Sequence, residues 1–105
     1  MQLELEYVIR KYLEETQKNE QGEIFVLLLE YLTHLFEDTD EPILLEDLTQ
    51  YEIDDFINFY LEDNFIEDKE IQNRTKQVLL QFLKFLKQKK YITIEEEKEW
   101  KEILN

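Results

Sequence analysis

Glycine and proline occur only once each in this chain, as Gly22 and Pro42, and this scarcity limits its folds more than any other feature. Tight turns depend on residues that adopt positive φ or preset a bend, and all-β folds need such turns at short intervals. The composition therefore argues against hairpins and sandwiches. It favours long uninterrupted helices, and we expect an all-α fold.

Apolar residues recur along the chain with the three- and four-residue spacing of amphipathic helices. This periodicity predicts five helical segments, at about residues 3–18, 23–36, 49–64, 68–90 and 93–105. The second segment is apolar around most of its circumference, so we expect it to be central and covered on most sides. We expect five apolar side chains of the middle segments to be buried: Leu28, Leu32, Phe56, Leu79 and Phe82.

Two helix starts carry a capping box, in which a threonine and a glutamate three residues later satisfy each other's backbone amides. Thr49 with Glu52 has this spacing at the start of the third segment, and Thr93 with Glu96 has it at the start of the last. We therefore predict that both threonines are N-caps.

The 105 residues and the 43% hydrophobic content suit one globular domain. We expect residues 1–105 to form a single orthogonal bundle of four to five helices. The chain has no cysteine, which agrees with a reducing compartment. Its first residues lack the basic region and apolar run of a secretory signal. The longest apolar run, residues 25–29, is far shorter than a membrane span, so we expect a cytoplasmic protein without a membrane partner.

Charge is distributed unevenly along a chain whose formal net charge is −14. Residues 1–68 contain 20 acidic and 3 basic side chains, whereas residues 69–90 contain 7 basic side chains and one acidic side chain. The acidic total works against binding to nucleic acid, because the field of the whole molecule repels phosphate. The basic fourth segment requires a separate explanation.

Four stretches of the sequence resemble the helical, SAM-like core-binding domain that lies N-terminal in tyrosine recombinases and phage integrases. They are Leu48–Ile57, Asn73–Thr75, Leu80–Leu86 and Lys90–Ile92. The resemblance implies a helical domain that clamps DNA, with contacts made here by Arg74, Thr75, Lys76 and Lys84. This chain lacks the family's catalytic domain, with its arginines and nucleophilic tyrosine, and its second helix is apolar where the family's is basic.

The basic residues of the fourth segment admit two interpretations. Arg74, Lys76, Lys84 and Lys87 contact either the phosphates of a nucleic acid or the acids of the first three helices in the same fold. We favour the second interpretation, because it lowers the self-repulsion of an acidic chain. We accordingly expect a non-enzymatic module that binds an unidentified protein partner, with nucleic-acid binding through residues 69–90 as the alternative.

His34 is the only histidine, and Glu30 and Asp38 lie four residues before and after it. On one helix such a trio would share a face and resemble a metal site. We favour an exposed imidazole on an acidic surface, because metal sites usually draw their ligands from several elements. The sequence contains no nucleophile elbow, phosphate-binding loop or paired-histidine motif, so we predict no catalytic residue, metal or cofactor.

Overall fold

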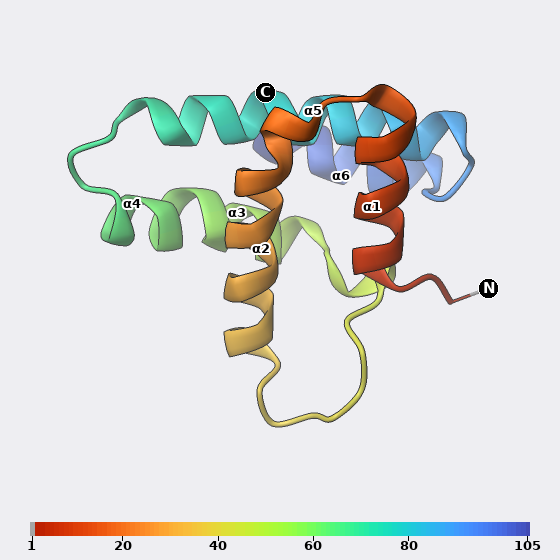
Figure 1. The fold of residues 1–105 in the computed structure, drawn as a ribbon, viewed down its shortest axis with the longest axis horizontal. Helices are drawn as coiled ribbons and strands as arrows, with labels where there is room; N and C mark the ends of the chain where they lie inside the picture. Colours follow the sequence, from red (N-terminus) through yellow and green to blue (C-terminus); the bar gives the residue numbers. More distant parts are fainter. Residues whose placement is uncertain (1) are drawn as a thin grey trace. The chain divides into compact units, whose positions relative to one another are not determined.

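The computed structural model describes residues 2–105, and this part of the chain is helical without a β-strand. Its five helices appear in Figure 1. They are α1 (Leu5–Thr16), α2 (Gly22–Leu35), a continuous helix made of α3 (Gln50–Asp55), the π-helical η3 (Phe56–Tyr60) and α4 (Leu61–Asn64), α5 (Glu70–Gln88), and α6 (Ile94–Leu104). Two 3₁₀ turns, η1 (Asn19–Gln21) and η2 (Leu45–Asp47), lie in the connections. The all-α prediction and the five helical segments are confirmed, with ends that differ by a few residues.

The contacts of the chain group into two units, one that ends at Leu48 and one that spans Thr49–Asn105. Helices that follow one another in the chain run antiparallel inside each unit (Figure 1), so neither unit by itself is an orthogonal bundle. The single-domain organisation and the orthogonal arrangement of the whole chain stay predictions.

The N-terminal unit is organised around the antiparallel pair α1 and α2, which η1 connects. Tyr12 joins all three elements. Its ring meets the ring of Phe25 edge to face, with 5.7 Å between the centroids, and its hydroxyl donates a hydrogen bond of 2.6 Å to Oε1 of Gln21. Burial raises the pKa of the Tyr12 hydroxyl above its ordinary value, and the negative charge of Glu20 raises it further. Tyr12 is therefore a neutral hydrogen-bond donor at neutral pH.

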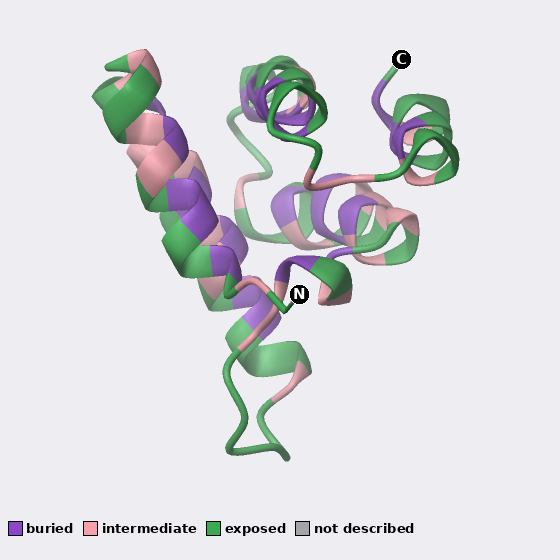
Figure 2. Ribbon diagram, turned by 90° about the vertical axis from the view of Figure 1, so that its right-hand side faces the viewer, coloured by how far each residue is buried: buried purple, intermediate pink, exposed green. Residues whose placement is uncertain are grey.

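The C-terminal unit packs three helices around one apolar core: the continuous helix 50–64, α5 and α6. Seen nearly end-on, they turn their buried sides toward one another (Figure 2). The ring centroids of Phe82 on α5 and Trp100 on α6 lie 6.4 Å apart. The buried apolar side chains of this unit are Ile53, Phe56, Ile57, Leu61, Ile71, Val78, Leu79, Phe82, Leu83, Phe85, Leu86, Trp100 and Leu104.

Both predicted N-caps are confirmed. The Thr49 hydroxyl accepts a hydrogen bond from the Tyr51 amide, and the Thr93 hydroxyl accepts one from the Glu96 amide. The side chains of Glu52 and Glu96 accept bonds from the threonine amides at 2.8 and 3.0 Å, which completes both capping boxes.

Burial confirms the predicted core side chains but not the predicted position of the second helix. Leu28, Leu32, Phe56, Leu79 and Phe82 are each 0% exposed. On α2, however, Val26 is 55% exposed and Leu35 is 48% exposed. The prediction that this helix is covered on most sides is therefore wrong, because its apolar side chains outnumber those that neighbouring elements cover.

The π-helical turn η3 changes which residues of helix 50–64 share a face. In an α-helix, residues four apart do not lie directly above one another: each is rotated by about 40° around the helix axis from the one before. Because hydrogen bonds in a π-turn span five residues, η3 takes up one extra residue and offsets much of this drift. Ile53, Ile57 and Leu61 are consequently all 0% exposed although four residues separate each from the next. The Gln72 amide of α5 donates a 2.8 Å hydrogen bond to the carbonyl of Ile57 within this turn.

None of the helices that residues 2–105 form combines the length and the apolar character that a bilayer crossing requires.

Candidate functional site

The first candidate surface is the basic face of α5, which we define as Arg74, Lys76, Lys84 and Lys87. The apolar stripe of α5 is buried, so its polar residues lie on the opposite side: Arg74, Lys84 and Lys87 are exposed, and Lys76 is half-buried. At about 100° per residue, Lys76, Lys84 and Lys87 fall within an arc of roughly 80°. Arg74 lies about 80° beyond Lys84 on the same outward half of the helix.

Two members of the basic face form ion pairs inside the C-terminal unit. Nη2 of Arg74 lies 3.3 Å from Oδ2 of Asp68, and Nζ of Lys87 lies 3.3 Å from Oε2 of Glu97. Glu97 is nearly buried and also receives Lys101 at 3.6 Å, so two cations balance one poorly solvated carboxylate. The acidic partners of Arg74 and Lys87 thus lie in the α4–α5 connection and on α6. The prediction that these partners belong to the first three helices is wrong for both pairs.

Lys76 and Lys84 differ from the other two members. Neither forms an ion pair with any described carboxylate. After Glu70, α5 carries no acidic residue, so the outward side around Lys84 is lined by neutral amides and further lysines. The ion pairs of the fold therefore do not explain this part of the basic face of α5.

Thr75 cannot belong to a nucleic-acid contact in this structure. The recombinase resemblance implies such a contact, but Thr75 is 0% exposed and its hydroxyl is buried. The contact implied for Thr75 is therefore wrong, because position 75 lies on the core side of α5 while positions 74 and 76 flank it.

The histidine trio is not assembled. Because α2 ends at Leu35, Asp38 lies outside the helix that carries Glu30 and His34. Nδ1 of His34 instead lies 3.7 Å from Oε2 of Glu37, and both side chains are mostly exposed. Within residues 2–105, no three histidine, cysteine or acidic side chains are placed to share a metal ion.

The second candidate surface is a stripe of alternating aromatic and acidic residues on helix 50–64, which we name the acidic–aromatic stripe. Tyr51, Asp55, Phe59 and Asp63 follow one another at intervals of four, so the π-turn that aligns the buried residues aligns these as well. Tyr51 is 75% exposed and Phe59 is 59% exposed. Tyr51 therefore lies outside the core of the unit. Its two-residue offset from the buried Ile53 was the signal that could have placed it outward.

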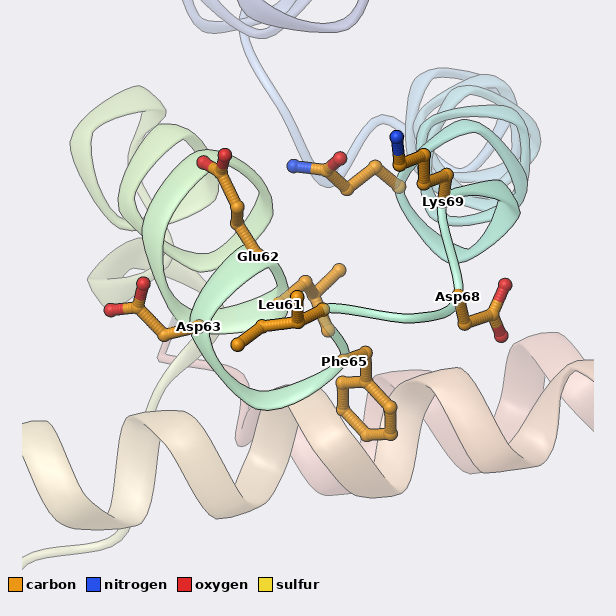
Figure 3. Close-up of a pocket in the computed structure, with 8 residues that line it drawn as sticks. Leu61, Glu62, Asp63, Phe65, Asp68 and Lys69 are labelled. Atoms are coloured by element: carbon orange, nitrogen blue, oxygen red, sulfur yellow. The ribbon is translucent and has the colours of Figure 1, made fainter.

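The C-terminal end of this stripe, at Asp63, adjoins a surface pocket of about 470 Å³, which lies between α4 and the start of α5 (Figure 3). The lining residues are Leu61, Glu62, Asp63, Phe65, Ile66, Asp68, Lys69 and Gln72. Glu62 on α4 and Lys69 before α5 extend to the same side of the pocket from opposite walls, whereas Asp63 lies on the outer side of α4. The pocket thus combines an apolar lining with three carboxylates and one ammonium group, and Asp63 makes it continuous with the stripe.

Comparison with known proteins adds no family assignment: no family model, curated protein or solved structure matches the chain.

Proposed function

We propose that this protein is a non-enzymatic interaction module that binds a protein partner through the acidic–aromatic stripe. The observation that carries the proposal is the exposure of Tyr51 and Phe59 on one line of helix 50–64. Tyrosine, tryptophan and arginine supply much of the binding energy at protein interfaces, because large rigid side chains bury much area for little entropy. The two aromatics therefore offer anchors that the core of the unit does not use.

The carboxylates of the stripe define the chemistry of the partner. Asp55 and Asp63 alternate with the aromatics on a chain whose net charge is −14. Complementary charge speeds encounter and rejects acidic competitors. The partner is accordingly a protein segment with apolar side chains flanked by lysine or arginine.

We expect proteins captured from a lysate of the source organism to be lost when the stripe is changed. The test compares the immobilised wild-type chain with a Tyr51→Ser, Phe59→Ser double variant, and repeats both captures after nuclease treatment. Exposed substitutions of this kind change stability by about 0.5 kcal/mol or less, so both proteins should fold. Circular dichroism checks the fold before capture.

The matched control is Ile94→Ser, which removes another apolar side chain, 71% exposed, at the start of α6. The proposal expects Ile94→Ser to retain the same proteins as the wild type. Equal retention by the double variant, or loss of every captured protein after nuclease treatment, would contradict it.

Nucleic-acid binding through the basic face of α5 is the second candidate, in line with the recombinase resemblance. The specific observation in its favour is that Lys76 and Lys84 lie on an acid-free side of α5 without ion-pair partners among the described residues. Against it, Arg74 and Lys87 are already paired, and the net charge of the chain opposes the approach of phosphate.

We expect duplex DNA not to bind measurably at about 150 mM salt, where non-specific DNA-binding proteins typically show dissociation constants of roughly 10⁻⁴–10⁻⁶ M. Fluorescence anisotropy of a labelled duplex at two salt concentrations measures this directly. The Debye length of about 8 Å at this ionic strength would still allow a compact basic face to act locally.

Two variants make the DNA experiment decisive. Lys76→Glu with Lys84→Glu reverses the two unpaired charges, and Lys98→Glu makes the same exchange on α6 as a control. Salt-sensitive micromolar binding that the double variant loses and Lys98→Glu keeps would contradict the leading proposal and favour the second candidate.

A further inference from the structure

The pocket between α4 and α5 contains carboxylates that the fold does not use. Asp68 is paired with Arg74 at 3.3 Å, but Glu62 and Asp63 form no ion pair with any described residue. The lining also includes the buried Leu61, the half-buried Phe65 and Ile66, which is 74% exposed. An apolar lining beside unpaired carboxylates is complementary to a side chain with an apolar stem and a cationic end.

We propose that this pocket receives an arginine side chain of the partner that docks on the acidic–aromatic stripe. This inference rests on the proposed function, because the arginine belongs to the protein partner proposed there. It adds the position at which that arginine binds. The three methylenes of arginine can cover the apolar lining while the guanidinium reaches the carboxylate at the pocket edge. The planar fork of the guanidinium pairs with a carboxylate through two parallel hydrogen bonds, which a lysine ammonium cannot reproduce.

Glu62 and Lys69, which lie on opposite walls of the pocket, should have opposite effects on the binding of a cation. Glu62 and Lys69 extend to the same side (Figure 3), so a cation that approaches Glu62 also comes near the ammonium group of Lys69. Glu62 attracts the guanidinium and Lys69 repels it. Removing the first charge should weaken the binding of arginine, and removing the second should strengthen it.

The test uses N-acetyl-L-argininamide and its uncharged analogue N-acetyl-L-citrullinamide, which has nearly the same shape. Chemical-shift changes of the backbone amides at residues 61–72 of the isotope-labelled full chain report binding at low salt. We expect the wild type to prefer the argininamide about fivefold, the ratio that an exposed ion pair of about 1 kcal/mol produces. Glu62→Gln should abolish the preference, and Lys69→Gln should increase it.

Glu67→Gln is the matched control, because Glu67 is an exposed carboxylate in the same connection that does not line the pocket. The inference expects this variant to keep the wild-type preference. Equal binding of the two compounds, shift changes that lie away from residues 61–72, or a preference that survives Glu62→Gln would overturn it. The proposed function is judged separately, since capture depends on Tyr51 and Phe59, which do not line the pocket.

Discussion

Replacing Phe82 with alanine is expected to lower the free energy of unfolding by about 3–5 kcal/mol, the usual cost of removing a buried aromatic ring. Phe82 is 0% exposed, and its ring contacts that of Trp100 across the α5–α6 interface. The truncation therefore removes apolar contacts and leaves a cavity between two helices. Small domains are stable by only about 5–15 kcal/mol, so the variant should be unfolded or close to it.

Trp100 is the only tryptophan of the chain, and its contact with Phe82 makes its fluorescence a direct measure of this unfolding. Phe59→Ala is the matched control: it makes the same chemical change on the same unit, at a side chain that is 59% exposed. We expect this control to change stability by about 0.5 kcal/mol or less. A Phe82→Ala protein that melts within a few degrees of the wild type would show that the core stripe of α5 is misassigned.

Replacing Leu28 with alanine should lower the free energy of unfolding by about 2–5 kcal/mol, because a buried leucine leaves a cavity that the surrounding side chains fill only in part. Leu28 is 0% exposed on α2, in the N-terminal unit. Urea unfolding followed by far-UV circular dichroism measures the loss. Leu35→Ala makes the same change on the same helix at a side chain that is 48% exposed, and it should cost much less.

The Leu28→Ala protein also tests the prediction that residues 1–105 form a single domain. Circular dichroism reports the helices of both units, whereas Trp100 fluorescence reports the C-terminal unit. In a single cooperative domain the two signals should change together, and Leu28→Ala should shift both to lower urea concentration. A shift of the dichroism signal alone would mean that the units unfold separately and that the single-domain prediction is wrong.

The helices and their starts could be predicted from the sequence because they depend on neighbours within one or two turns. The capping boxes at Thr49 and Thr93 join groups only three residues apart, so their hydrogen bonds need no tertiary partner. The buried stripe of α5, which includes Leu79 and Phe82, follows from helical periodicity alone. The all-α class was predictable as well, because a chain with one glycine and one proline lacks the turn residues that β folds need.

For the ion pairs of the basic face, the sequence predicted that partners exist but not which residues they are. Net charge indicated that the bases of α5 would meet acids of the same chain, and Arg74 and Lys87 do so. Their partners, Asp68 and Glu97, could not be chosen from the sequence, because acidic residues are abundant and only the packing of α6 against α5 brings Glu97 to Lys87.

The sequence by itself determined the helical class, the five helices and the two capped starts, since these depend on local hydrogen bonds and periodicity. Only the tertiary structure decided which apolar side chains are left uncovered. Val26 and Phe59 are as apolar as their buried neighbours, but no described element covers them, and a π-turn places Phe59 in line with Tyr51. Hydrophobicity measures the gain from burial, whereas burial itself requires a neighbouring surface, which a linear pattern does not contain.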